Sequence, residues 1–431
     1  MNVWLVTIGE PLPLALSKED RLHRTGQFAQ FLASRGHHVV WWTSAFDHFR
    51  KRHHFEQDAT VSVAPNLIVR ALRGCGYARN ISLNRFKDHT LIARKFAAAA
   101  SQSDPPDVIV AALPTIELCH ASVEYGRRRG IPVVLDMRDM WPDVMVDAVP
   151  KPIRPLGRLM LSPLYGQARR AFGSATAIMG ITEEFVDWGL RSGGRRRGPL
   201  DRAFFFAYEA SAPSADKLAA AEAYWDGLGV SKREDGLTIC YFGNVGAQLD
   251  LTHIVDAARE FDRRQRSVRF ILCGSGERLD EYRRRSQGLP NLLLPGWVDG
   301  AQIWTLMRRS NAGLDPLPNR YDFLATINNK AVEYLSAGLP VISSPRKGVL
   351  CDLLKEGACG LSYSSGSVEE LIELIERLLS DRSALASMSA RAQEVFAHHF
   401  MASAAHERMT EYLTEVVSST VLQRAASPKV T

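Results

Sequence analysis

The chain has 431 residues, of which 46% are hydrophobic, 23% charged and 9% aromatic. These proportions exclude a disordered chain, a collagen-like chain and a small disulfide scaffold, and the length predicts two or three domains. The formal net charge of +6 is unevenly distributed, since residues 1–210 hold 28 of the 53 basic side chains but only 20 of the 47 acidic ones. We therefore expect an anionic surface or substrate to meet the first half.

The six cysteines form no C-x-x-C pair, and several lie in apolar runs, so we expect buried thiols in a reducing compartment. No spacing typical of a zinc or iron–sulfur site occurs, and no metal is predicted. The N-terminal apolar run is short and lacks a basic leader, and no stretch approaches about 18 uninterrupted apolar residues. We expect a cytoplasmic protein, either free or peripheral on the inner face of the cytoplasmic membrane.

Short runs rich in β-branched residues alternate with helical patterns along the chain. In the first half, strands are expected at 3–8, 37–44, 108–113, 131–135 and 175–181, and helices at about 27–32, 115–129 and 183–190. In the second half, strands are expected at 237–242, 268–273, 291–294, 312–316 and 339–343, and helices at 250–262, 299–309, 329–336, 367–380, 383–398 and about 402–418. This alternation predicts an α/β protein with parallel sheets covered on both faces.

Two such sets of βα units in one chain predict two Rossmann-like domains. The first domain is expected at 1–210 and the second at 211–395, with a hinge region at 211–236 where the pattern changes. Residues 396–431 are expected to form a last helix and a tail.

Ligands of open parallel sheets bind outside the carboxyl ends of the strands. After the first strand come Gly9 and Glu10, which would let a ligand approach the backbone and place a carboxylate beside it. An ordinary turn between strand and helix explains the same residues.

A denser group follows the strand at 131–135, where Asp136, Arg138 and Asp139 stand within four residues. A buried charge needs a partner or a function, so one carboxylate could act as a general base or stabilise a cation. Trp141 nearby would raise the pKa of a carboxyl group that it desolvates. The alternative is an Asp–Arg pair that only orders the loop. Nucleic acid is not expected as a partner, because the aromatic spacing of a single-strand binder is absent.

In the second half, glycine turns follow two strands and an aromatic residue follows a third. The residues concerned are Gly243, Asn244, Gly246, Gly274, Gly276, Trp297 and Val298. Two glycine turns at neighbouring strand ends suit a phosphate or nucleotide, and the missing G-x-G-x-x-G pattern counts against a NAD enzyme. The sequence leaves two interpretations of Trp297 open: contact with a nucleotide base, or packing in the core.

A helix is expected to begin at Asn328 and Asn329. Free backbone N–H groups and the positive end of the helix dipole would attract a diphosphate there, and Lys330 adds a charge in the first turn. Glu333 lies three residues further on and could accept two ribose hydroxyls. The alternative is a Lys330–Glu333 salt bridge on a solvated helix.

Five segments carry the most characteristic sequence. They are DMRDMWPD at 136–143, YFGNVG at 241–246, LCGSGE at 272–277, LPGWV at 294–298 and NNKAVEYLSAGLPVISS at 328–344. Together they resemble a family 4 glycosyltransferase of the GT-B fold, over roughly residues 1–415. The first segment further resembles the subgroup that builds bacterial surface polysaccharides, including aminosugar transferases of O-antigen and capsule.

The resemblance implies two Rossmann-like domains that face a central cleft, with a final helix that crosses back to the N-terminal domain. The N-terminal domain would take the acceptor, and the C-terminal domain would hold a nucleotide-sugar, usually a UDP-sugar. A hexosyltransferase of this kind retains the anomeric configuration and needs neither metal nor cofactor, because the nucleotide-sugar is a substrate. The acceptor would be a polyprenol-linked or growing glycan.

Carried over by position, Glu333 matches the second glutamate of the family's E-x7-E motif, which binds the ribose. The first glutamate falls at Ala325, and Ala247 stands where a basic residue often follows the Gly-Asn-x-Gly turn. Lys330 is then the best remaining partner for the diphosphate. The two alanines could also mark a degenerate domain that binds a nucleotide or scaffolds a partner enzyme.

The family's histidine near the reacting centre corresponds to Arg138 or Asp139, and we select Asp139. In a retaining transfer the departing phosphate can itself accept the acceptor proton, so Asp139 could act only by orienting the acceptor. Gly9, Glu10 and Asp136 are the predicted acceptor contacts. A sugar-nucleotide 2-epimerase shares the fold, but it would bring further carboxylates and histidines that we cannot identify here.

Residues 151–173 mix basic and apolar side chains, among them Arg158, Leu156, Leu159 and Met160. This pattern predicts an interfacial patch for an anionic membrane surface, which would suit an acceptor linked to lipid. The alternative is a solvated basic face with a buried apolar stripe.

Overall fold

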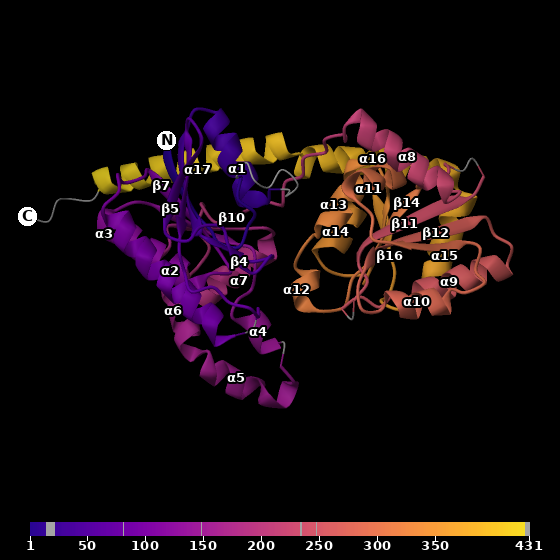
Figure 1. The fold of residues 1–431 in the computed structure, drawn as a ribbon, viewed down its shortest axis with the longest axis horizontal. Helices are drawn as coiled ribbons and strands as arrows, with labels where there is room; N and C mark the ends of the chain where they lie inside the picture. The colour runs from indigo at the N-terminus through magenta and orange to yellow at the C-terminus, as the bar shows by residue number, and fades with distance from the viewer. Residues whose placement is uncertain (14–21, 81, 148, 233–234, 247, 427–431) are drawn as a thin grey trace, which may run out of the picture. The chain divides into compact units, whose positions relative to one another are not determined.

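The computed structural model describes residues 1–13, 22–80, 82–147, 149–232, 235–246 and 248–426. The chain forms two compact units, one of Met1–Phe205 with Ser403–Thr431 and the other of Phe206–Ala402. The sequence analysis expected the boundaries between these units after residue 210 and at residue 396. Figure 1 shows each unit as a sheet with helices on both faces, and the α/β fold class is confirmed.

The first unit contains an eight-stranded sheet in the order β10-β9-β8-β7-β1-β2-β6-β5. Its strands are β1 Asn2–Val6, β2 His38–Ser44, β5 Ala59–Ala64, β6 Leu67–Leu72, β7 Val108–Ala112, β8 Val133–Met137, β9 Ala177–Gly180 and β10 Arg202–Ala203. Neighbouring strands are parallel, except that β5 runs antiparallel to β6 at one edge. Because β2 and β7 lie on opposite sides of β1, the direction of winding reverses between β1 and β7.

The second unit contains a six-stranded parallel sheet in the order β13-β12-β11-β14-β15-β16. Its strands are β11 Leu237–Asn244, β12 Val268–Ser275, β13 Leu292–Gly296, β14 Ala312–Pro316, β15 Val341–Ser344 and β16 Gly360–Ser362. Winding reverses between β11 and β14, so their carboxyl ends are where a ligand is expected.

Helices cover both sheets. Those of the first unit are α1 Arg24–Ser34, α2 Leu83–Ser101, α3 Ile116–Arg129, α4 Asp143–Asp147, α5 Arg154–Met160, α6 Ser162–Ser174 and α7 Glu183–Gly193. Those of the second unit are α8 Ala215–Gly227, α9 Thr252–Arg263, α10 Leu279–Arg285, α11 Gly300–Arg308, α12 Tyr321–Leu324, α13 Asn329–Ser336, α14 Val349–Glu356, α15 Val368–Ser380 and α16 Arg382–His399. Local sequence sets several ends: Asp299 and Gln302 form a capping box at α11, and Gly130 ends α3 in the left-handed conformation.

The last helix, α17 Ala402–Ala426, packs on the first unit. Its Tyr412 and Leu413 join the apolar core formed with Phe28 and Leu32 of α1. The crossing-back that the resemblance implied is therefore present, and the helix extends eight residues beyond the expected end at 418.

Part of the predicted hinge region is a packed helix. The indole N–H of Trp225 in α8 donates to the carbonyl of Gln302 in α11 at 2.8 Å, and Trp225 is fully buried. Residues 215–227 therefore belong to the body of the second unit. Among the described residues, no helix is both long and apolar enough to cross a membrane.

Candidate active site

The glycine turns after β11 and β12 lie side by side in the second unit. Gly243 is paired with Gly274, and Asn244 with Ser275. A Cβ atom on Gly274 would lie 1.9 Å from the carbonyl oxygen of Gly243, and its φ of +148° is one that side chains rarely permit. Glycine is thus required for the two turns to approach this closely.

These turns open into a cavity of about 360 Å³, within the range of small-ligand sites. Its lining residues are Phe242, Gly243, Asn244, Cys273, Gly274, Ser275, Trp297, Val298 and Ile303. Trp297 is 71% exposed, so its interpretation as core packing is wrong, whereas Val298 is buried. Five of the predicted nucleotide contacts therefore meet at one cavity.

The other five predicted contacts do not line this cavity: Gly246 and Gly276 in the glycine turns, and Asn328, Asn329 and Glu333 at α13. A Cβ atom on Gly276 would lie 2.5 Å from the Val245 carbonyl and 2.8 Å from the backbone nitrogen of Gly246. Gly276 instead allows the two turns to pack against each other, since any side chain there would meet the backbone of Val245 and Gly246.

The start of α13 is built on a buried carboxylate that the sequence analysis missed. Asp315, at the end of β14, is fully buried and accepts hydrogen bonds from Asn328 Nδ2 at 2.6 Å and Lys330 Nζ at 3.1 Å. The other side-chain atom of Asn328, Oδ1, accepts from the backbone N–H of Ala331 and so caps the helix. A carboxylate within the last residues of a buried strand was the signal that could have found Asp315.

Lys330 is held as a cation. Burial lowers its pKa, but the Asp315 carboxylate outweighs burial, so the pKa of Lys330 lies above its usual value. Its Nζ also lies 4.6 Å from the centre of the Tyr241 ring. The ion-pair partner of Lys330 is therefore the buried Asp315, while Glu333 adds a smaller interaction that also raises the pKa of Lys330.

The other predicted residues around the start of α13 differ in their solvent exposure. Asn329, the first residue of α13, is exposed, and Glu333 is half-buried one turn further on. Ala325, at the position of the family's first glutamate, is buried just after α12. Ala247 lies outside the described residues.

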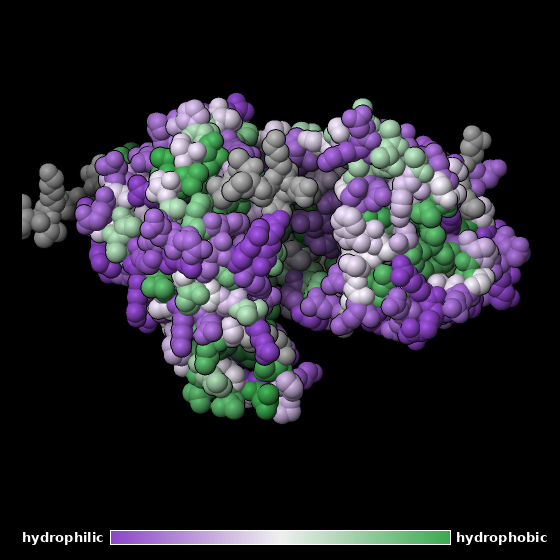
Figure 2. Space-filling view, viewed as in Figure 1, coloured by the Kyte–Doolittle hydropathy of each residue, from purple (hydrophilic) through white to green (hydrophobic). Residues whose placement is uncertain are grey.

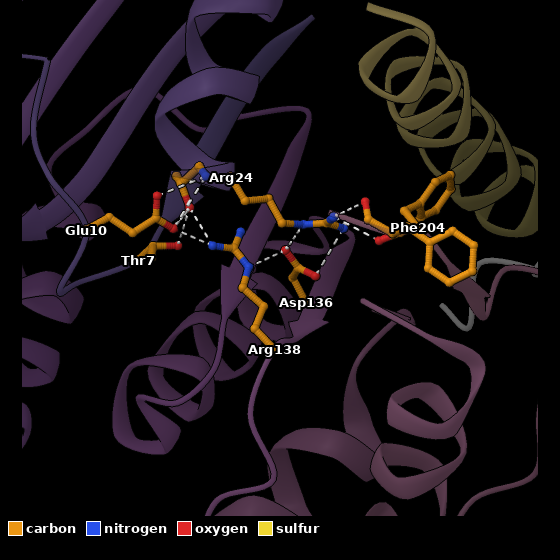
Figure 3. Close-up of polar contacts among 8 residues, drawn as sticks. Thr7, Glu10, Arg24, Asp136, Arg138 and Phe204 are labelled. Carbon is orange, nitrogen blue, oxygen red and sulfur yellow. Dashed lines mark hydrogen bonds and ion pairs between the residues drawn. The ribbon is translucent and has the colours of Figure 1, made fainter. Parts of the chain in front are cut away.

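At the carboxyl edge of the first unit's sheet, four charged side chains form one network (Figure 3). Arg138 donates to Glu10 and, through Nε, to Asp136 Oδ2 at 2.6 Å. Arg24 donates through Nε to the same Asp136 oxygen at 3.0 Å. Glu10 also accepts from the backbone N–H and hydroxyl of Thr25, so it holds the start of α1.

Asp136 and Arg138 are held in their charged forms, whereas burial and the like charge of Arg138 lower the pKa of Arg24. Burial raises the pKa of Asp136, but Arg138 and Arg24 outweigh it and hold that pKa below its usual range. Burial lowers the pKa of Arg138, but Asp136 and Glu10 outweigh it and raise that pKa. The sequence missed Arg24, which lies 112 residues before Asp136.

This network corrects three predicted roles. Asp136 has no exposed surface, so it cannot touch an acceptor and instead positions its neighbours. Arg138 is nearly buried and already paired with Asp136, so the alternative in which an Asp–Arg pair orders the loop is the better account of it. Glu10 is nearly buried and paired with Arg138, which fits the alternative of a structural turn between strand and helix. Gly9, with φ of +81°, makes the turn before Glu10 and packs beside His48.

Asp139 makes other contacts. Its Oδ1 accepts from the backbone N–H of Met140 at 2.7 Å, and its charge acts on Arg85, whose guanidinium lies 4.4 Å from the centre of the Trp141 ring. Asp139 is half-buried, so it can reach a ligand.

Further polar side chains of the same edge were not predicted. The loops after β2 and β6 bring His48 Nδ1 within 2.6 Å of the Tyr77 hydroxyl, and α2 contributes buried His89. Burial and the neighbouring Lys51 and Arg85 lower the pKa of His48 to about 4, so its imidazole is neutral at pH 7. No group of three or more His, Cys, Asp or Glu within the described residues is placed to hold a metal ion.

The chain matches two family models, "Glycosyl transferase 4-like domain" over residues 23–200 and "Glycosyl transferases group 1" over residues 229–395. The alpha-D-kanosaminyltransferase of Streptomyces kanamyceticus is 24% identical over 253 residues, which are 58% of this chain and 62% of that protein. The match thus spans less than two thirds of that relative.

Two solved structures share the fold. HepE of Anabaena, in complex with UDP, has a TM-score of 0.63 at 15% identity and covers 96% of this chain and 100% of its own. WaaG, a glycosyltransferase involved in lipopolysaccharide biosynthesis, has a TM-score of 0.59 at 14% identity and covers 96% and 99%. The fold and the two family models together define a glycosyltransferase of the GT-B type. The chain belongs to family 4 of these proteins.

Proposed function

We propose that the protein is a retaining hexosyltransferase that moves a sugar from a nucleotide-sugar, most simply a UDP-sugar, to a glycan acceptor in polysaccharide biosynthesis. The observation that carries the proposal is the cavity between the glycine turns of β11 and β12, with exposed Trp297 at its wall. HepE, a structural neighbour, was solved with UDP and with UDP-glucose, and the kanosaminyltransferase supports an amino sugar as donor.

In the donor half-reaction, negative charge develops on the departing diphosphate. The free N–H groups at the start of α13 and the ammonium of Lys330 stabilise that charge. Asp315 keeps Lys330 protonated and fixes its position before substrate binds. Trp297 stacks on the base, and Glu333 accepts the ribose hydroxyls.

In the acceptor half-reaction, Asp139 orients the attacking hydroxyl or takes its proton. The buried network of Glu10, Arg138 and Asp136 fixes the loop from which Asp139 projects. The acceptor is a glycan carried on a membrane lipid, and the protein works on the inner face of the cytoplasmic membrane without a metal.

The test is a thermal-shift panel of UDP, GDP, ADP, dTDP and CMP with their sugar nucleotides, in the presence of a chelator. A ligand that binds only the native state raises the melting temperature by mass action, so one nucleotide should give a clear shift. That nucleotide then defines the donors for a transfer assay.

A second candidate function rests on buried Ala325, where the family has a glutamate near the donor sugar. A degenerate domain would bind a nucleotide without turnover and scaffold a partner enzyme. Nucleotide binding with no transfer to any glycan acceptor would favour this alternative, and sugar release or transfer would exclude it.

A further inference from the structure

A hairpin loop beyond the carboxyl end of β2 is held in one conformation. The short strands β3 Phe46–Asp47 and β4 Arg52–His53 pair antiparallel and leave residues 48–51 as the loop between them. Asp47 is buried, and its Oδ1 accepts from two backbone N–H groups of the loop, both at 2.9 Å. Lys51 completes the turn with φ of +53°, in the left-handed region that residues other than glycine adopt infrequently. A loop constrained in this way presents its side chains in fixed positions.

Two cations of this edge share one aromatic ring. Lys51 Nζ lies 4.9 Å from the centre of the Tyr77 ring, and the guanidinium carbon of Arg85 lies 5.5 Å from it. Both cations also bind Asn80, because Lys51 Nζ donates to its Oδ1 and Arg85 Nη1 donates to its backbone carbonyl at 3.0 Å. Among the residues that the structure describes, neither cation forms an ion pair with a carboxylate.

The basic groups of this edge hold their protons less tightly than usual. Burial lowers the pKa of Lys51 and of Arg85, and the charge of Asp139 does not outweigh burial at Arg85. Burial and these two cations lower the pKa of His48 to about 4. Lys330, which has a carboxylate partner, shows the opposite shift. The positive charge at this edge therefore lacks a close counter-ion, and an anionic group would stabilise it.

An exposed aromatic ring and a neutral polar group lie beside the two cations. Phe49 exposes 60% of its surface, and its ring centre lies 5.4 Å from that of His48. It is separate in sequence from the apolar surface of α5, which Figure 2 shows in green at the tip where Figure 1 places that helix. His48 Nδ1 is engaged by the Tyr77 hydroxyl, and its Nε2 has no hydrogen-bond partner in the described part of the chain. An apolar ring beside a few fixed polar groups suits the apolar face and the hydroxyl groups of a sugar.

These contacts join five side chains into one group, the edge cluster, which consists of His48, Phe49, Lys51, Tyr77 and Arg85. The edge cluster adjoins the residue proposed to meet the attacking hydroxyl. Arg85 also contacts the ring of Trp141, two residues after Asp139, and the charge of Asp139 acts on Arg85. A ligand held by Arg85 is therefore a neighbour of Asp139.

We propose that the edge cluster binds an acidic sugar of the acceptor glycan, a hexuronate residue. The carboxylate of the sugar binds the ammonium of Lys51 and the guanidinium of Arg85. A ring hydroxyl bonds to Nε2 of His48, and the apolar face of the sugar lies on Phe49. The inference rests on the proposed function and narrows it, because it names the chemical class of the acceptor sugar.

The charge of the edge cluster favours a carboxylate over a phosphate ester. Asp139 and Glu117 both act on Arg85 and already offset part of its charge. A carboxylate adds one negative charge, whereas a phosphate monoester adds about 1.5 to 2 at pH 7. The smaller charge is therefore the better match for two cations that already have acidic neighbours.

The first test compares methyl β-D-glucuronide with methyl β-D-glucoside, in saturation-transfer NMR with the full chain. The glucuronide should bind at least about tenfold more tightly, and salt should weaken its binding. Lys51→Asn and Arg85→Gln should each weaken glucuronide binding about tenfold, the effect of one charged hydrogen bond, and leave glucoside binding unchanged. Asparagine tolerates the left-handed conformation, so Lys51→Asn preserves the turn. Lys87→Gln is the control, because Lys87 is exposed on the same helix as Arg85. Equal affinity for the two glycosides, or an equal loss in the control, would overturn the proposal.

Two further measurements test the ligand class and the aromatic contact. Glucose 1-phosphate should bind less tightly than the glucuronide, and tighter binding would assign the edge cluster to a phosphate ester and overturn the proposal. Phe49→Ser should weaken both glycosides alike, by about threefold, because the sugar face is common to them. Leu422→Ser is its control, because Leu422 near the end of α17 is similarly exposed. Unchanged affinities in Phe49→Ser would overturn the placement of the sugar on Phe49.

Nucleotide binding keeps the possible failures apart. UDP-induced thermal shifts of Lys51→Asn and Arg85→Gln should equal that of the wild type, because neither residue lines the donor cavity. Arg85 also packs on two aromatic rings, so Lys51→Asn decides the outcome if Arg85→Gln melts early. If UDP binds and sugar is transferred to neutral glycans without any preference for the glucuronide, only this inference is wrong. If the glucuronide binds with the expected preference and no nucleotide binds, the edge cluster stands and the proposed function is wrong.

Discussion

Lys330→Ala should destabilise the second unit as well as weaken the donor site. Its Nζ lies 3.1 Å from Oδ1 of Asp315, a carboxylate with no exposed surface. Removing one partner of a buried ion pair leaves an uncompensated charge and costs about 3–5 kcal/mol. Because the Lys330 side chain keeps 13% exposure and Asn328 still donates to Asp315, we expect the low end, about 3 kcal/mol.

A double variant separates the structural part from the functional part. Lys330→Met with Asp315→Asn removes both charges at similar volume, so it should recover about 2 kcal/mol of the lost stability. It should nevertheless bind UDP as poorly as Lys330→Ala, because the ammonium is gone in both. Urea unfolding followed by circular dichroism gives the stabilities, and calorimetry gives the UDP affinities.

Two results would refute parts of this reasoning. If Lys330→Ala unfolds within about 0.5 kcal/mol of the wild type, the pair does not behave as a buried one. If the double variant binds UDP like the wild type, Lys330 does not contact the diphosphate. The pH dependence has a definite sign: since Asp315 raises the pKa of Lys330, the pair's contribution is complete at neutral pH and is lost only as pH rises through that raised pKa.

Three other variants test separate features. Glu333→Ala should weaken nucleotide binding by about 1–3 kcal/mol through lost charged hydrogen bonds. Unchanged nucleotide affinity in calorimetry would show that Glu333 does not bind the ribose. Trp297→Ala should weaken nucleotide binding by about 1–3 kcal/mol through lost stacking on the base. Because Trp297 is largely exposed, the melting temperature of the free protein should not change, and a clear drop would point to packing instead. His406 is buried on α17, and burial and Arg24 lower its pKa to about 4. Its imidazole is neutral in the folded chain but protonates near pH 6.5 when unfolded, so stability should fall by up to about 3 kcal/mol as the pH drops from 6.5 to 4. His406→Phe should lose less over that range in urea titrations, and an equal loss would assign the acid sensitivity to other groups.

The sequence predicted the donor side of the site better than the acceptor side. The glycine turns and the start of α13 are local features, because each needs only a strand end followed by particular residues. Gly243, Gly274 and Trp297 therefore came together at one cavity as expected. The sequence analysis did not identify Asp315, because a carboxylate near the end of a strand resembles a turn residue. Its role becomes visible only when its partners Asn328 and Lys330 are placed around it.

The acceptor side depends on contacts between distant parts of the chain. Arg24 begins a helix, and nothing in its neighbourhood indicates that it binds Asp136 or the carbonyls of Phe204 and Phe205. Arg24 is buried because it makes these contacts, whereas the sequence around it resembles an ordinary exposed helix start. The exposure of the apolar side chains in α5, in contrast, was one of the two interpretations that the sequence left open, and exposed Leu159 and Met160 exclude the buried stripe.

The donor cavity has a consequence for how such proteins diversify. All of its lining residues lie between Phe242 and Ile303, in the second unit, and the glycine turns hold its shape without help from Asp139 or its surroundings. Under the proposed function, the residues that select the nucleotide and those that select the acceptor therefore lie in separate stretches of the chain. Substitutions near Trp297 and Val298 can alter the first while leaving the second intact, so the two specificities are free to evolve independently.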